Sequence, residues 1–221
     1  AAALQNYTPE LAQAVREGES KTDHYEDILG TYLVKLSALK ISENDSSEAA
    51  MLLKALSDFE RIGDHALNIL ESAEELKCKN LSLSDAARHE LSVLLRAVDE
   101  IVDMTFQAFR DGDLEKAYRV EPLEQVIDDL KEKMRIHHIL RMQQGSCSIE
   151  SGFVWSDLLT ALERVGDHCS NIAVCMIQIH DNSFDTHSYI SDLKATNNEE
   201  FRRKFTVFSE KYMLPDAKKT D

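Results

Sequence analysis

Four pairs of acidic residues are spaced so that the two carboxylates of each pair would share one face of a helix. The pairs are Glu19 with Asp23, Glu60 with Asp64, Glu124 with Asp128, and Glu163 with Asp167. Side chains at positions i and i+4 of a helix lie one turn apart on the same face. Two neighbouring carboxylates repel each other by about 0.3 kcal/mol, so a cation is expected to favour these rows.

Two of the pairs belong to a repeated string. Residues 60–69 read ERIGDHALNI and residues 163–172 read ERVGDHCSNI, which are identical at seven of ten positions and stand 103 residues apart. The other two pairs precede these strings and are 105 residues apart. The chain therefore contains two copies of one unit of about 100 residues.

Carboxylate oxygens suit hard cations such as Mg²⁺, Ca²⁺ and Mn²⁺, and oxidised iron also takes them. A single ExxxD spacing in a chain with 40 acidic residues is most simply a solvated helix face. Here the spacing recurs in register in both repeats, which favours metal binding. Spacing alone leaves the two interpretations open.

The remaining positions of the repeated string have their own interpretations. Gly63 and Gly166 fall in the middle of helices, where glycine costs about 1 kcal/mol relative to alanine, and a close approach of two helices would explain them. His65 and His168 directly follow the aspartates and so point away from the acidic row. Polar packing and metal ligation both remain open for the histidines.

The composition excludes several classes of protein. The chain has 221 residues, with 25 Lys and Arg against 40 Asp and Glu, and a formal net charge of −15. This balance argues against nucleic acid and against an anionic membrane surface, because both need clustered basic residues. The four cysteines form no CxxC pair, which indicates reduced thiols in a cytosolic setting. No run of 18 apolar residues occurs, so we expect no direct membrane insertion of this chain.

Helical periodicity dominates the chain and no segment alternates as a strand does, so the predicted fold class is all-α. Only seven glycines and three prolines are present, which disfavours turn-rich β folds. The predicted N-cap residues are Thr8, Asp45, Ser84 and Asp113. The predicted helices are 9–39, 45–76, 84–110, 113–144, 152–180, 189–194 and 199–212.

The repeats divide the chain into a first unit of residues 1–80, a second unit of residues 81–182, and a tail of residues 183–221. The acidic pair at Glu124 is preceded by a whole helix, whereas Glu19 is preceded by only 18 residues. If the unit is three helices, the first unit lacks its opening helix. We expect that helix to precede Ala1 in a longer protein.

The doubled ERxGDHxxNI string, with ExxxD pairs one helix earlier, resembles the PhoU family. More narrowly, the chain is similar to the PhoU-like cytoplasmic domain at the C-terminus of bacterial sodium/phosphate cotransporters. The resemblance implies two tandem three-helix bundles related by pseudo-twofold symmetry. It also implies metal clusters held through the ExxxD motifs, with iron, zinc, nickel or manganese as candidate metals. Carried over position by position, the ligands would be Glu19, Asp23, Glu60, Asp64, Glu124, Asp128, Glu163 and Asp167.

The resemblance further implies a regulatory role without a catalysed reaction. The expected partner is the membrane domain of a phosphate transporter, with a signalling protein as a second one, and a homodimer is compatible with acidic bundle faces. The expected location is cytoplasmic, tethered to the inner face of the membrane as part of a longer protein. The cofactors would be divalent or trivalent metal ions.

Three alternatives compete with this interpretation. One is a free-standing PhoU-type adaptor that regulates a phosphate ABC transporter and its sensor kinase. Another is a metal-free docking module whose acidic rows form salt bridges with a partner. A ferritin-like oxidase is disfavoured, because that fold needs a histidine three residues after the glutamate, whereas His65 and His168 follow Glu60 and Glu163 by five.

Overall fold

The computed structural model describes residues 4, 6–181 and 199–214, and these residues form long helices with no strand, as predicted. The helices are α2 (Pro9–Ser37), α3 (Glu43–Cys78), α4 (Asp85–Asp111), α5 (Leu114–Gln143), α6 (Ile149–Asp181) and α8 (Glu199–Lys211). The predicted helix 189–194 lies outside the described residues. Within the described residues, none of the helices combines the length and the apolar character needed to cross a membrane.

Three of the predicted N-caps are confirmed. The side chains of Thr8, Ser84 and Asp113 accept hydrogen bonds from the backbone amides at the third positions of α2, α4 and α5. These bonds satisfy amides that have no partner inside the helix. Between α4 and α5, Gly112 has a left-handed backbone (φ 66°), which lets the chain reverse within two residues.

The start of α3 was predicted three residues too late. Ser42, not Asp45, is the N-cap: its hydroxyl accepts from the Asp45 amide at 3.1 Å, while the Asp45 carboxylate accepts from the Ser42 amide at 3.4 Å. Asp45 therefore closes a capping box from inside the helix. Likewise α6 begins at Ile149 rather than near Gly152, because the Ser148 hydroxyl accepts from the Ser151 amide at 3.1 Å.

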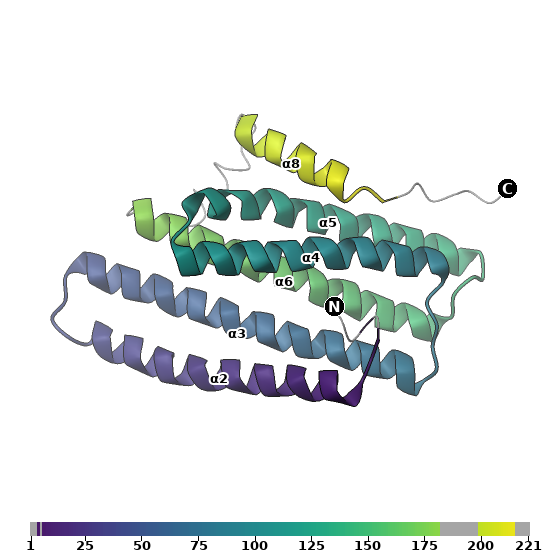
Figure 1. Cartoon of the computed structure of the whole chain (residues 1–221), viewed down its shortest axis with the longest axis horizontal. Coiled ribbons are helices and arrows are strands. Elements are labelled where there is room, and N and C mark those ends of the chain that lie inside the picture. Colours follow the sequence, from purple (N-terminus) through teal and green to yellow (C-terminus); the bar gives the residue numbers. More distant parts are fainter. Residues whose placement is uncertain (1–3, 5, 182–198, 215–221) are drawn as a thin grey trace.

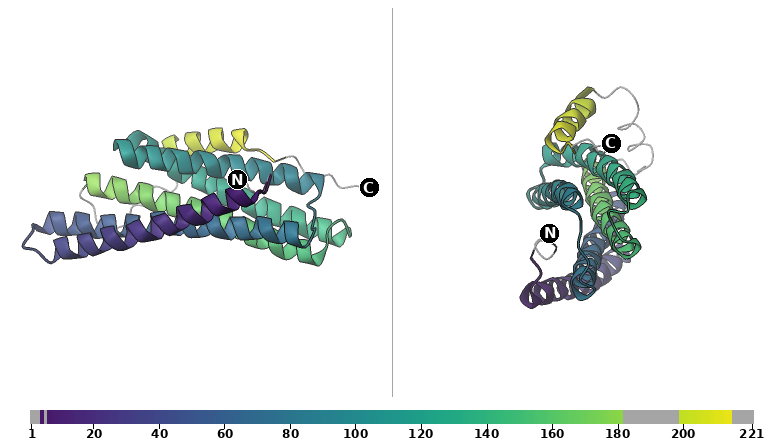
Figure 2. Two further views of the ribbon diagram at one scale, coloured as in Figure 1. Left: turned by 60° about the horizontal axis from the view of Figure 1, so that its bottom comes forward. Right: turned by 90° about the vertical axis from the view of Figure 1, so that its right-hand side faces the viewer.

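The helices are arranged as two groups that meet at the centre of an elongated molecule. Helices α2 and α3 form one antiparallel hairpin, and α4, α5 and α6 form a bundle. The two groups contact each other along α3 and α6, while α8 lies against α5. Helices α2 and α8 therefore occupy opposite edges of the molecule (Figures 1 and 2). We call α2 with α3 the first repeat and α4, α5 and α6 the second repeat.

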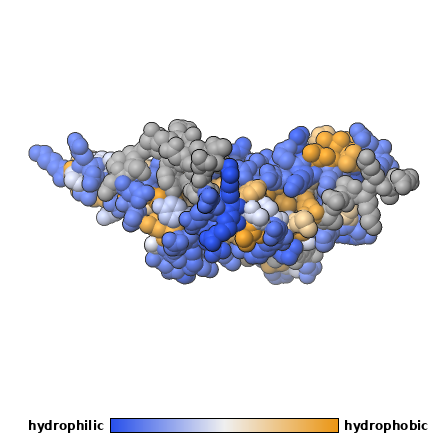
Figure 3. Space-filling view, turned by 90° about the horizontal axis from the view of Figure 1, so that it is seen from above, coloured by the Kyte–Doolittle hydropathy of each residue, from blue (hydrophilic) through white to orange (hydrophobic). Residues whose placement is uncertain are grey.

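The main apolar core lies in the second repeat and continues under α8. Its fully buried members come from all three helices of that bundle, and α8 adds Phe208 and Tyr212. Trp155 at the start of α6 is buried as expected of a core residue, whereas its neighbour Phe153 is 69% exposed and does not anchor the core. Seen from above, most of the described surface is hydrophilic, with apolar side chains in smaller groups (Figure 3).

The first repeat is thin by comparison. In α2 only Ala12 is buried, and large apolar side chains face outwards. These are Tyr25, Ile28, Leu29, Tyr32 and Val34. Among the described residues, no helix covers this face in the way that α4 covers α5 and α6.

Candidate metal centre

In the first repeat, the two acidic pairs meet where α2 lies against α3. A β-carbon placed on Gly63 of α3 would lie 3.7 Å from the Thr22 Cβ and 3.9 Å from the Glu19 Cα of α2. The helices therefore meet at the glycine, and the backbone of Glu19 in α2 lies next to Gly63, the residue before Asp64 in α3. The distances are ordinary van der Waals contacts, so an alanine would also fit at this position.

The second repeat uses the same contact. A β-carbon on Gly166 of α6 would lie 3.6 Å from the Ile127 Cγ2 and 4.0 Å from the Glu124 Cγ of α5. Ile127 and Glu124 stand 105 residues after Thr22 and Glu19, so the two helix pairs have the same register. In each repeat, the two helices that meet at the glycine therefore carry one acidic pair each.

In the second repeat a lysine joins the two acidic helices. The Lys131 Nζ of α5 lies 2.9 Å from the Glu163 Oε1 of α6 and 4.0 Å from the Asp128 Oδ1. Arg164 pairs with Asp167 at 3.0 Å on the outer side of α6. Glu163 is the most enclosed of these groups, with a side chain 13% exposed. The four carboxylates of this repeat therefore have two cations among them.

In the first repeat, as far as the described residues show, an arginine pairs with the row on α3. Arg61 lies 3.3 Å from Asp64 and 3.7 Å from Glu60, measured between guanidinium nitrogens and carboxylate oxygens. Partial burial raises the pKa of Glu60, and the negative charge of Asp64 raises it further. The pKa of Asp167 in the second repeat is also raised, first by burial and then by the charge of Glu163.

The donor atoms of the first repeat fit a hard cation, because they are all carboxylate oxygens that repel one another. In the described part of the chain, however, no three His, Cys, Asp or Glu side chains are placed as a metal site. Arg61 and Arg164 draw the aspartates outwards along their own helices. In the second repeat Lys131 already lies between the carboxylates. The metal ligands therefore stay a prediction, and the first repeat fits it better.

The histidines of the repeated string lie at the contact between the two repeats. The rings of His65 and His168 stack with their centroids 5.4 Å apart. The His168 Nδ1 lies 2.8 Å from the Asp58 Oδ1, and the Asn171 side-chain amide donates to the same oxygen at 3.0 Å. The structure thus places both histidines in polar packing between α3 and α6.

Asp58 is a polar contact that the sequence analysis did not identify. It is only 7% exposed and bridges the two repeats through His168 and Asn171. One signal was available: the position 103 residues later is Ala161, so Asp58 departs from the repeat on an otherwise apolar face. This departure makes the contact between the repeats asymmetric.

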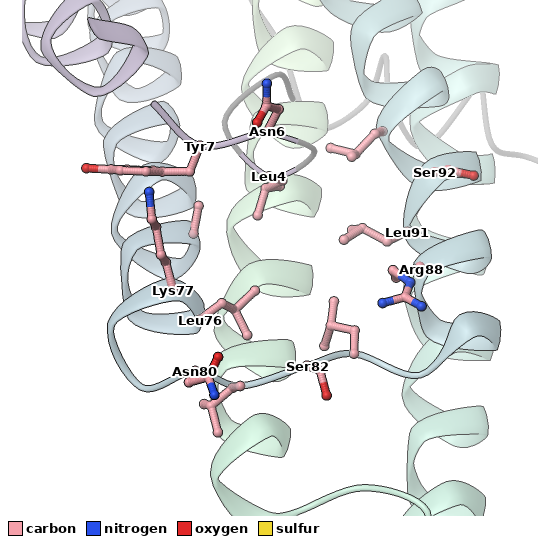
Figure 4. A pocket seen from close by; sticks show the side chains of 14 residues that line it. Leu4, Asn6, Tyr7, Leu76, Lys77, Asn80, Ser82, Arg88, Leu91 and Ser92 are labelled. Atoms are coloured by element: carbon pink, nitrogen blue, oxygen red, sulfur yellow. The ribbon is translucent and has the colours of Figure 1, made fainter. Parts of the chain in front are cut away.

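The largest described pocket is remote from the acidic rows. It has a volume of about 720 Å³ and is lined by Leu4, Asn6 and Tyr7, by the end of α3 and by the start of α4. Leu76 of α3 and Leu91 of α4 point into it, with Lys77 and Arg88 at its edge (Figure 4). None of the described lining residues is a His, Cys, Asp or Glu, and the polar side chains of the lining include those of Tyr7, Lys77 and Ser92.

The fold and these contacts define an all-helical protein of two repeats. In each repeat, two helices that each carry an acidic pair lie against each other. The chain belongs to the PhoU domain family, whose model matches residues 1–73 and 91–176. Both acidic rows fall inside the matched residues.

Several known proteins are similar to this chain. One is a "Phosphate-specific transport system accessory protein PhoU homolog 1" from Thermotoga maritima, 33% identical over 133 residues, which cover 58% of this chain and 54% of the relative. The chain thus spans about half of that relative. The accessory protein PhoU of Serratia marcescens is 28% identical over 176 residues, which cover 77% of this chain and 69% of that protein. The crystal structure of PhoU from Pseudomonas aeruginosa superposes with a TM-score of 0.73 at 26% identity, covering 82% of this chain and 86% of that one.

Proposed function

We propose that this chain is a PhoU-type accessory protein that regulates phosphate transport without catalysing a reaction itself. The observation that carries the proposal is the family match across both repeats, together with relatives whose names describe accessory proteins of phosphate transport.

The proposed partner is a phosphate-specific transport system. The relatives are named as accessory proteins of such a system, which favours the free-standing adaptor over the cotransporter domain that the sequence analysis preferred. The two alternatives make different predictions about binding. We expect a tagged copy of the chain to co-purify with components of the phosphate-specific transporter from cells grown in high phosphate.

The regulatory claim has its own test. Deletion of the gene region that encodes this chain should alter phosphate uptake when external phosphate is high, because the restraint on transport is lost. Unchanged uptake at both low and high phosphate would contradict the proposal. Co-purification with a sodium/phosphate cotransporter instead would identify the other partner.

We also propose that the acidic row of the first repeat binds metal. Glu19, Glu60 and Asp64 would hold the ion, with Asp23 at the edge of the row. A bound cation would neutralise the crowded carboxylates and join α2 to α3, and this supports a structural role for the metal. Elemental analysis of protein purified without chelators tests the proposal, since Glu60→Gln should lower the metal content while the helical circular dichroism is unchanged. Equal metal content in the variant would show that the assigned ligands are wrong, whereas wild-type protein without bound metal would favour the metal-free docking module.

A further inference from the structure

The acidic rows of the two repeats differ in charge at one position of the contact between their helices. The acid pairs of α2 and α5 are 105 residues apart, and the same offset relates Glu26 of α2 to Lys131 of α5. Glu26 is half-buried, as are Glu19 and Thr22 on the face of α2 that lies against α3. Within these rows, the first repeat therefore has a fifth carboxylate at the position where the second repeat has an ammonium group.

Lys131 is placed as a counter-ion between two helices. Its Nζ lies 2.9 Å from a Glu163 oxygen on α6 and 4.0 Å from an Asp128 oxygen on its own helix. The lysine side chain is 21% exposed and that of Glu163 is 13% exposed, so water screens this pair less than an ordinary surface pair. An ammonium that bridges carboxylates of α5 and α6 supplies positive charge to this row without a metal ion.

We propose that Lys131 is the built-in cation of the second repeat, so that the acidic row of this repeat holds no divalent cation, whereas Glu26 stands at the equivalent position of the first repeat. The contrast with the first repeat rests on the metal binding proposed above. The repeated ERxGDHxxNI string then supplies one acidic pair of each row. The residue at position 26 or 131 decides whether the row binds a metal ion.

The electrostatics of the two rows agree with this assignment. Burial and the charge of Asp64 are the main causes that raise the pKa of Glu60, and the charge of Glu26 adds to them. For Asp167, burial and Glu163 raise the pKa, whereas the positive charges of Arg164, His168 and, last, Lys131 lower it. A fifth negative charge thus increases the repulsion in the first row, while the lysine decreases it in the second.

Titration with Mn²⁺ followed by electron paramagnetic resonance tests the proposal, because free and bound Mn²⁺ give different spectra. Lys131→Glu should add Mn²⁺ binding in the second repeat, roughly doubling the stoichiometry, and Asp167→Asn in that background should remove the addition. Glu26→Lys should abolish binding at the first repeat. Lys133→Glu is the matched control, since it makes the same charge change on an exposed part of α5 and should leave the stoichiometry unaltered.

Two results would overturn the proposal while leaving metal binding intact. One is wild-type protein that loses bound Mn²⁺ on Glu163→Gln, since the second repeat would then bind metal despite its lysine. The other is Lys131→Glu with unchanged stoichiometry in protein that binds Mn²⁺ normally at the first repeat.

The role of Lys131 can be judged even if no variant binds Mn²⁺, a result that would refute the proposed metal function. Without metal, Lys131→Met should lower the melting temperature by about 1–3 °C, because the ion pair with Glu163 is lost. The same change in a Glu163→Gln background should have no further effect. Equal melting temperatures for wild type and Lys131→Met would show that the lysine is not a counter-ion.

Discussion

The two repeats use the same local contact in different surroundings. In both, a mid-helix glycine of the repeated string lies against the helix that bears the preceding acidic pair. The second repeat buries this contact beside a large core and places Lys131 among its carboxylates. The first repeat has Glu26 at that position and little core of its own. The string therefore determines which helices meet, while residues outside it determine the charge and the burial.

Equivalent positions on α2 and α5 make the difference in burial explicit. Tyr25 is 61% exposed, whereas Leu130, its equivalent 105 residues later, is 3% exposed. Leu29 is 46% exposed, whereas its equivalent Met134 is completely buried. Helix α4 covers α5 and α6 within the second repeat, and no described helix covers α2 in that way. An apolar side chain stabilises the fold only where another element removes it from water.

The largest expected effect comes from breaking the core of the second repeat. Met134→Ala should cost about 2–5 kcal/mol of unfolding free energy, because it leaves a cavity at a site that is fully buried. Leu29→Ala, at the equivalent position of α2, should stay within about 0.5 kcal/mol of wild type. Urea unfolding followed by Trp155 fluorescence and by helical circular dichroism measures both. Similar costs for the two variants would mean that the outer face of α2 is covered in solution.

Breaking the contact between the repeats should cost less. Asp58→Ala should destabilise the protein by about 1–3 kcal/mol, because His168 and Asn171 lose their shared acceptor. Asp58→Asn keeps an acceptor oxygen and serves as the control, with a smaller loss expected. Urea unfolding again gives the free energies. If Asp58→Ala were neutral, the bridge between α3 and α6 would contribute nothing to stability.

Replacing the glycines should have a smaller and favourable effect. A β-carbon at Gly63 or Gly166 would make only ordinary contacts, so alanine should stabilise each helix by up to about 1 kcal/mol. Valine is the matched contrast, because its extra methyl groups would press on the facing helix. Thermal unfolding compares the four variants. A destabilising Gly63→Ala would show that the helices approach more closely than the structure indicates.

The smallest expected effects come from replacing one glutamate in each acidic row. The pKa of folded Glu60 is raised above its ordinary value of 4.5, so the folded state binds protons more tightly than the unfolded state. Stability therefore falls as the pH rises through and above that value. In metal-free protein, Glu60→Gln should remove this loss and add about 0.3 kcal/mol at pH 7, with little change at pH 4.

The equivalent change in the second repeat should have the opposite sign. Glu163→Gln removes the partner of Lys131 and should cost up to about 1 kcal/mol at pH 7. Melting temperatures of both variants between pH 4 and pH 7 measure the pair of effects. Stabilisation by both substitutions would contradict the assignment of Lys131 as a counter-ion.

The sequence predicted most of the secondary structure because the signals are local. Thr8, Ser84 and Asp113 cap helices as expected, since a capping side chain bonds amides only two or three residues away. The predicted start of α3 was wrong because Ser42 with Asp45 and Asp45 with Glu48 both have the spacing of a capping box, and the structure uses the first pair. Two overlapping patterns of capping residues cannot be ranked without the backbone.

By itself, the sequence determined the all-helical class, the doubled unit and the spacing within the acidic pairs, because periodicity and repetition are properties of the chain. Only the tertiary structure decided what surrounds those rows. The stacking of His65 on His168, the bridge from Asp58 and the ion pair of Lys131 with Glu163 each join residues of different helices. Packing sets such distances, and the strength of a charge pair depends on distance and burial, neither of which the order of residues contains.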